Sequence, residues 1–315
     1  MLCAKLGYRL CLLLLCTLAF SACSLLQINR SRVRSKYERA GLLAHDVELS
    51  SGTLHYYDGG SGPPVLLIHG FAFGALETWE NQVPEFARTH RVIAPDLFWF
   101  GQSVPKGAMD DAEKQARALS ELLGRLGLGK IAIVGVSFGG YVALELGLRS
   151  PAHAGKLVLI DAAGLAPTAA ESRTVTANFA GKQHIADLLI PQSAEELRLL
   201  LKTLFYKQHH IPTCLLRQIL REEFWQNREA KRRICDNMEA ADGFLPPAAL
   251  HELGAKTLLI WGRHDPLILP TIGARLAAAI PDSQILYFER SAHSPMLEEP
   301  KRFNAEVLRF LAEPP

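Results

Sequence analysis

Short apolar runs alternate with longer amphipathic stretches along most of this chain. Each run is apolar throughout, as strands buried on both faces of a sheet must be, and each ends in a polar or glycine-containing turn. Stretches between them, such as 110–123 and 300–311, have the apolar spacing of helices. This alternation predicts an α/β fold in which helices cover both faces of a mostly parallel sheet. The predicted strands are 65–68, 91–94, 131–134, 156–160, 257–261 and 284–288.

The alternation is interrupted between residues 165 and 250, where no run has the character of a buried strand. Two or three amphipathic helices take its place, one of them opened by Ser193 and Glu196 at the spacing of a capping box. We therefore predict a helical cap at 165–250, inserted into a core formed by 46–164 and 251–315.

The N-terminus differs from the rest of the chain. Lys5 and Arg9 precede an uncharged run over 10–29, which is typical of an export or membrane signal. Ser21-Ala22-Cys23 resembles the lipobox of bacterial lipoproteins, but a stretch of about 20 uncharged residues also suits an uncleaved anchor. Plain secretion stays open. We predict a leader or anchor at 1–23, a linker at 24–45, and membrane association with the folded domain in the periplasm or outside the cell.

Charge and cysteine content exclude some classes of protein. The 34 basic and 32 acidic residues are interspersed, so no one-sign field would attract nucleic acid. Four of the six cysteines lie in the leader, which leaves Cys214 and Cys235. The sequence therefore shows no disulfide framework and no metal-binding CxxC spacing, and whether these two residues pair stays open.

A GxSxG sequence at residues 135–139 is the motif that most directly indicates a catalytic function. Gly135-Val136-Ser137-Phe138-Gly139 follows the predicted strand at 131–134 and precedes a helical stretch. In this setting a GxSxG sequence holds its serine on a strained tight turn, and the glycines let neighbouring backbone pass closely. Ser137 is therefore the predicted nucleophile.

A serine hydroxyl needs a base to remove its proton and a carboxylate to orient that base. Asp265 and His293 each follow a predicted strand, and the carboxyl ends of parallel strands share one sheet edge. We predict His293 as the general base and then acid, and Asp265 as the carboxylate that fixes its tautomer. Asp161 also follows a strand and is the rival acid. The Gly-Arg-His-Asp loop favours Asp265, and we expect Asp161 to cap the turn into the insertion.

Acyl transfer develops an oxyanion that needs N–H donors already in place. One predicted donor is the backbone N–H of Phe138, at the start of the helix after the nucleophile. The other is the N–H of Phe71, in the loop after the strand at 65–68. His69 is expected to be a structural residue under this loop.

Together these segments resemble the α/β-hydrolase superfamily, from about residue 46 to the end apart from the cap. The resemblance implies an α/β-hydrolase fold with a mostly parallel eight-stranded sheet, and a structural role for Asp96. The chain is similar to capped esterases, monoacylglycerol-type lipases and carbon-carbon bond hydrolases. Ser137 departs from epoxide hydrolases and haloalkane dehalogenases, whose nucleophile is Asp, and Phe71 departs from the HGGG lipases. The matching segments are His69-Gly70-Phe71, Ala94-Pro95-Asp96-Leu97, Gly101-Gln102-Ser103, Gly135 to Gly140, Gly262 to Asp265 and Ala292-His293.

The predicted triad indicates a serine hydrolase that uses no cofactor and no metal. Phe73, Phe98 and Trp99 are expected to contact the substrate in an apolar acyl pocket, which favours an esterase or lipase acting on a small-molecule or lipid ester. A carbon-carbon bond hydrolase of the meta-cleavage-product type and a cofactor-free haloperoxidase keep the same triad, and the motifs do not separate them. The complete catalytic set disfavours a noncatalytic lipid-binding lipoprotein. Acyl length, alcohol group and oligomeric state stay open.

Overall fold

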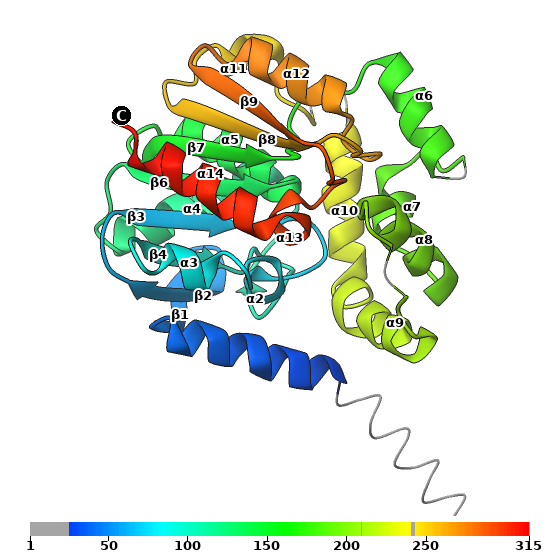
Figure 1. The fold of residues 1–315 in the computed structure, drawn as a ribbon, viewed down its shortest axis with the longest axis horizontal. Coiled ribbons are helices and arrows are strands. Elements are labelled where there is room, and N and C mark those ends of the chain that lie inside the picture. The colour runs from blue at the N-terminus through cyan, green and yellow to red at the C-terminus, as the bar shows by residue number, and fades with distance from the viewer. Residues whose placement is uncertain (1–24, 180, 209, 241–242, 315) are drawn as a thin grey trace, which may run out of the picture.

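The computed structural model describes residues 25–179, 181–208, 210–240 and 243–314, and the predicted leader at 1–23 lies outside them. A central sheet carries helices on both faces, and further helices form a cap beyond the ends of the strands (Figure 1). The predicted α/β architecture is confirmed. The six predicted strands form the parallel part of the sheet.

The sheet has nine strands. Eight follow the order β1-β2-β4-β3-β6-β7-β8-β9, and the two-residue β5 pairs with β2 beside this path. The neighbours along the stretch β4-β3-β6-β7-β8-β9 are all parallel. Strand β2 pairs with β1, β4 and β5 in antiparallel fashion. The strands are β1 Leu42–Leu49, β2 Gly52–Gly60, β3 Pro64–Ile68, β4 Arg91–Pro95, β5 Val104–Pro105, β6 Ile131–Val136, β7 Ala154–Ile160, β8 Lys256–Gly262 and β9 Ser283–Phe288.

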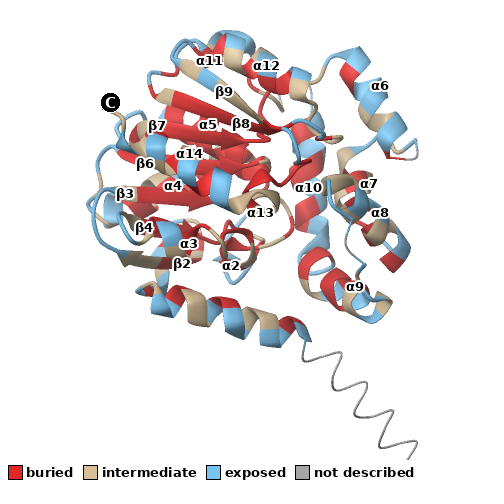
Figure 2. Cartoon of the chain, in the orientation of Figure 1, coloured by how far each residue is buried: buried red, intermediate tan, exposed pale blue. Residues whose placement is uncertain are grey.

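Alternate residues of the parallel strands face two separate cores, which explains why their sequences are apolar throughout. On β6, Ile133 packs into one core and Val134 into the other. Figure 2 shows the inner parallel strands as almost wholly buried, whereas the edge strand β9 is mostly half-buried. The first core is covered by α4 Ala112–Arg125, α5 Phe138–Arg149, α11 Pro247–Leu250 and α12 Pro270–Ala279, and the second by α2 Ala75–Thr78, α3 Val83–Phe86, α13 Pro295–Glu298 and α14 Pro300–Ala312.

The predicted linker at 24–45 has regular secondary structure over most of its length. Residues 25–39 are helical and β1 begins at Leu42. Val33 and Tyr37 on this N-terminal helix are fully buried in the second core, and the Tyr37 hydroxyl donates to the Ala75 carbonyl at 2.9 Å. The many basic residues of this segment suggested a solvated linker and obscured its apolar face.

None of the helices within the described residues is long and apolar enough to cross a membrane.

The cap leaves and re-enters the core at one narrow neck. Leu165 and Leu245 pair there as an isolated parallel bridge, and the Leu245 N–H donates to the Gly164 carbonyl at 2.8 Å. Cys214 in the cap is exposed and Cys235 is buried, and both thiols are free. The cap contains α6 Ala169–Asn178, α7 Ile185–Leu189, α8 Ala194–Leu204, α9 Thr213–Ile219, the π-helical turn η1 Leu220–Phe224 and α10 Arg228–Glu239.

Candidate active site

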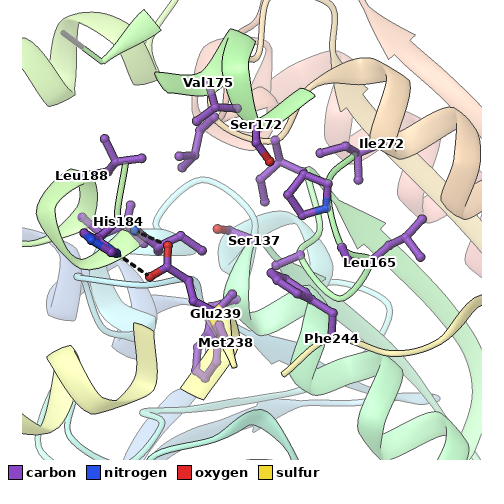
Figure 3. Close-up of a pocket in the computed structure, with 18 of the residues that line it drawn as sticks. Ser137, Leu165, Ser172, Val175, His184, Leu188, Met238, Glu239, Phe244 and Ile272 are labelled. Carbon is purple, nitrogen blue, oxygen red and sulfur yellow. Dashed lines mark hydrogen bonds and ion pairs between the residues drawn. The ribbon is translucent and has the colours of Figure 1, made fainter. Parts of the chain in front are cut away.

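Ser137 lies in the tight turn between β6 and α5. Its backbone has φ 54° and ψ −119°, which a non-glycine residue adopts only where its surroundings enforce it. A Cβ on Gly135 would lie 2.3 Å from the Gly139 carbonyl oxygen, and a Cβ on Gly139 would lie 2.2 Å from that of His69. Both glycines are therefore required by close backbone contacts. Figure 3 shows the Ser137 hydroxyl pointing into the main cavity.

Asp265 and His293 meet in the loops that follow β8 and β9. His293 Nδ1 lies 2.7 Å from Asp265 Oδ2, and both side chains are buried. The other carboxylate oxygen accepts the N–H groups of Leu267 and Ile268 at 2.8 and 3.0 Å. These bonds orient the carboxylate so that Oδ2 accepts the Nδ1–H of His293. Nε2 is then the ring nitrogen available to the serine.

No hydrogen bond joins Ser137 to His293 in the described part of the chain. The two are linked through β7 instead. The Ser137 N–H donates to the Ile160 carbonyl at 2.8 Å. Asp161 follows Ile160, and one of its carboxylate oxygens lies within 4.8 Å of a carboxylate oxygen of Asp265 and of a ring nitrogen of His293. All three predicted triad residues thus lie at one sheet edge. A bond between nucleophile and base often tightens only when substrate is bound.

The sequence led us to expect that the Asp161 side chain caps the turn into the insertion, but in the structure it does not. It is fully buried, has φ 40°, and its Oδ1 accepts the Gly262 N–H at 2.8 Å across the ends of β7 and β8. Burial, followed by the charge of Asp265, raises the pKa of Asp161 well above its usual range. The raised pKa disfavours the charged form of Asp161, and His293 Nδ1 bonds to Asp265, so Asp265 is the better candidate for the acid.

The loop after β3 passes directly over the nucleophile. A Cβ at Gly70 would lie 3.3 Å from the Ser137 Cβ, so the backbone at Phe71 is close to the serine. Neither the Phe71 N–H nor the Phe138 N–H donates to another group among the described residues. Both donors therefore remain available to an oxyanion.

His69 supports this loop from beneath. Its Nε2 accepts the Leu97 N–H at 2.8 Å, and its Nδ1 lies 2.7 Å from the Gly70 carbonyl oxygen, to which it donates. Burial lowers the pKa of His69, which agrees with a neutral ring that donates from one nitrogen and accepts at the other. Asp96 holds the neighbouring loops by accepting the N–H groups of Ala75 and Gln102 at 2.8 and 2.9 Å.

A cavity of about 990 Å³ opens from Ser137 towards the cap. Phe71 and Phe138 line it beside the serine, and apolar side chains from the cap, the neck and the loop after β8 form most of its walls (Figure 3). Among these apolar residues are Leu165, Val175, Ile185, Leu188, Leu189, Met238, Phe244, Leu245, Leu267, Ile268 and Ile272. The sequence did not single them out because helical spacing does not tell which face of a cap helix turns inward.

A model of the alpha/beta hydrolase family matches residues 65–306 of the chain. The chain belongs to the alpha/beta hydrolase family. The fold and the hydrolase class predicted from the sequence are thereby confirmed.

This hydrolase has relatives of known name and structure. A 2-hydroxy-6-oxo-6-phenylhexa-2,4-dienoate hydrolase of Burkholderia cepacia is 30% identical over 275 residues, which cover 84% of this chain and 93% of the relative. The crystal structure of a membrane phospholipase A is 26% identical, with a TM-score of 0.77, and covers 96% of this chain and 98% of its own. A meta-cleavage product hydrolase from Pseudomonas fluorescens IP01 is 25% identical, with a TM-score of 0.71, over 84% and 96%.

The three aromatic residues predicted to contact substrate do not line the main cavity of the hydrolase, so their contact with substrate stays a prediction. Phe98 is fully buried in the first core, where its N–H donates to Gln115 of α4. Phe73 packs edge-on against Phe224 of the cap, with ring centroids 6.2 Å apart. Trp99 borders a separate cavity of about 380 Å³ beside the N-terminal helix. The loops after β3 and β4 direct these side chains into packing contacts, which aromatic character alone does not reveal.

One cluster of three metal-ligand side chains occurs among the described residues, and it consists of Asp161, Asp265 and His293. Oδ1 of Asp161 and both carboxylate oxygens of Asp265 already accept hydrogen bonds, and His293 Nδ1 is bonded to Asp265. The arrangement suits orientation of an imidazole and its proton transfer better than coordination of a metal.

Replacing Asp161 with Asn is expected to weaken the dependence of stability on pH. Above about pH 3.9 the unfolded chain releases a proton that the folded Asp161 retains, so wild-type stability falls as pH rises towards the raised pKa. Asn removes this contribution. The melting temperature of Asp161→Asn should exceed that of wild type by more at about pH 7.5 than at about pH 4.5. An equal difference at the two pH values would contradict a neutral Asp161.

Proposed function

We propose that this hydrolase cleaves carboxylic esters with apolar acyl groups through an acyl-enzyme on Ser137. The observation that carries the proposal is the cavity: Ser137, Phe71 and Phe138 all line it, and its other walls are mostly apolar. An acyl chain fits such walls because it removes apolar surface from water without requiring a charged partner.

The residues have separate roles in the proposed reaction. His293 takes the Ser137 proton while the hydroxyl oxygen attacks the ester carbonyl, and Asp265 stabilises the imidazolium that forms. The N–H groups of Phe71 and Phe138 bind the oxyanion. His293 then protonates the leaving alcohol, and water activated by the same base releases the acid from Ser137.

A carbon-carbon bond hydrolase is the second candidate, and the curated relatives favour it because the Burkholderia cepacia enzyme is named for a dienoate. A dienoate brings a carboxylate into the site, and burying a carboxylate is costly without a cation. Each basic side chain that lines this cavity already has an acidic partner. The pairs are Lys182 with Glu196 at 3.3 Å, His184 with Glu239 at 3.5 Å and Arg275 with Glu171 at 2.6 Å.

A chain-length series on purified enzyme separates the two candidates. We expect turnover of p-nitrophenyl esters from acetate to palmitate, and little turnover of a dienol-diketone. In Leu188→Phe, which narrows the cavity, long-chain turnover should fall about tenfold while acetate turnover changes less than about twofold. Leu199→Phe is the matched control because Leu199 is exposed on α8 and does not line the cavity. Turnover of the dienol-diketone without turnover of any ester would overturn the proposal.

We also propose that residues 1–23 attach the enzyme to a membrane, where lipid esters are abundant. The proposal is supported by the uncharged leader sequence. Because the N-terminal helix that follows it packs against the core, such an anchor would hold the active site close to the bilayer. Recovery of the full-length chain in the soluble fraction after cell lysis would contradict this localisation.

A further inference from the structure

A short cap segment, residues 204–207, which follows the body of α8, touches the loops of both the catalytic acid and the base. The backbone N–H of His293 donates to the Leu204 carbonyl at 3.1 Å. The ring of Tyr206 stacks on His264, the neighbour of Asp265, with centroids 4.7 Å apart and planes inclined by 24°. The cap segment therefore contacts both loops directly, although neither contact has a part in the chemistry proposed above.

Glu298, the last residue of α13, joins the same two parts of the molecule through its carboxylate. Oε1 accepts the N–H groups of Tyr206 and Lys207 at 2.7 and 3.2 Å. Oε2 accepts the N–H of Ala292, which directly precedes His293, at 2.7 Å. The carboxylate of the adjacent Glu299 accepts the Arg290 N–H and the Ser291 hydroxyl and pairs with Arg302 of α14 at 3.7 Å. Glu298 is thus the glutamate of this pair that reaches the cap.

We propose that Glu298 is a positioning residue that places His293 only while cap segment 204–207 lies against the catalytic loops. It acts through the backbone of Ala292 and does not touch the substrate. The cap helices α6 and α7 supply walls of the cavity. The cap position that closes the cavity is therefore also the position in which His293 is held in place. A cap displaced to admit substrate would also release the base. Proton transfer would then be confined to the closed, water-poor site.

This inference rests on the proposed serine hydrolase chemistry, so its test uses a probe that needs the triad but no particular ester. The full-length enzyme is inactivated with a fluorophosphonate, and the limiting inactivation rate is separated from the binding constant of the probe. Glu298→Gln keeps the volume of the side chain but has a single acceptor oxygen, so one side of the bridge is lost. Glu306→Gln is the matched control, because Glu306 forms a surface pair with Arg309 on α14.

We expect Glu298→Gln to lower the limiting rate by about 10- to 100-fold while the binding constant changes less than about twofold. Glu306→Gln should match wild type. Equal limiting rates for Glu298→Gln and wild type would overturn the inference and leave the serine hydrolase chemistry intact. Wild-type protein that the probe does not label would overturn both.

A second variant keeps the inference testable if Glu298→Gln does not fold. Tyr206→Ala removes the ring that stacks on His264 and leaves every triad residue in place. Its limiting rate should fall by about threefold to tenfold, again with an unchanged binding constant. A wild-type limiting rate in Tyr206→Ala would show that the cap segment does not position the base.

Discussion

Ser137→Ala is expected to lower ester turnover by about 10⁶-fold, to the level that the oxyanion donors and substrate binding supply without a nucleophile. The loss should be this large because base and acid act only through the serine hydroxyl, so that Asp265→Asn would add little to it. Turnover of a p-nitrophenyl ester by the purified variant measures the effect.

The control for this substitution is Ser120→Ala. Ser120 is half-buried on α4 and does not line the main cavity, so its variant should match wild type. A Ser137→Ala enzyme that keeps more than about a hundredth of wild-type turnover would rule out Ser137 as the nucleophile.

Asp265→Asn is expected to lower turnover by about 10⁴-fold, because the amide no longer fixes the productive tautomer of His293. Asp161→Asn is expected to change turnover by less than about fivefold, since burial raises the pKa of Asp161 and favours its neutral form, which Asn resembles in shape and charge. Parallel assays of the two purified variants measure this contrast. A larger loss in Asp161→Asn than in Asp265→Asn would reverse the assignment of the acid.

The parallel part of the fold could be predicted because burial on both faces leaves a strong mark on the sequence. Every residue of a strand such as 131–136 must be apolar or small. The antiparallel β1 lacks this mark, because most of its residues are exposed at the sheet edge. The packing of the N-terminal helix against the core could not be predicted for a similar reason, since its few buried residues stand among many charged ones.

Some parts of the candidate site follow from local sequence and topology, and others depend on how the cap packs. Ser137, Asp265 and His293 each follow a strand, and topology alone brings such positions to one edge. The cavity walls depend instead on how the cap helices rotate and dock. Aromatic residues in nearby loops were therefore poor guides: Phe98 turned into the core, whereas Leu188 and Phe244 of the insertion line the cavity.

The central claim is that an ester acylates Ser137, and trapping the acyl-enzyme tests it most directly. The purified wild-type enzyme is mixed with a p-nitrophenyl ester of a medium-chain acid, quenched in acid before steady state, digested and analysed by mass spectrometry. The account predicts one acyl group on Ser137, and none on the same peptide of Ser137→Ala. Hydrolysis of the ester without acylation of Ser137, or acylation of another residue, would contradict it.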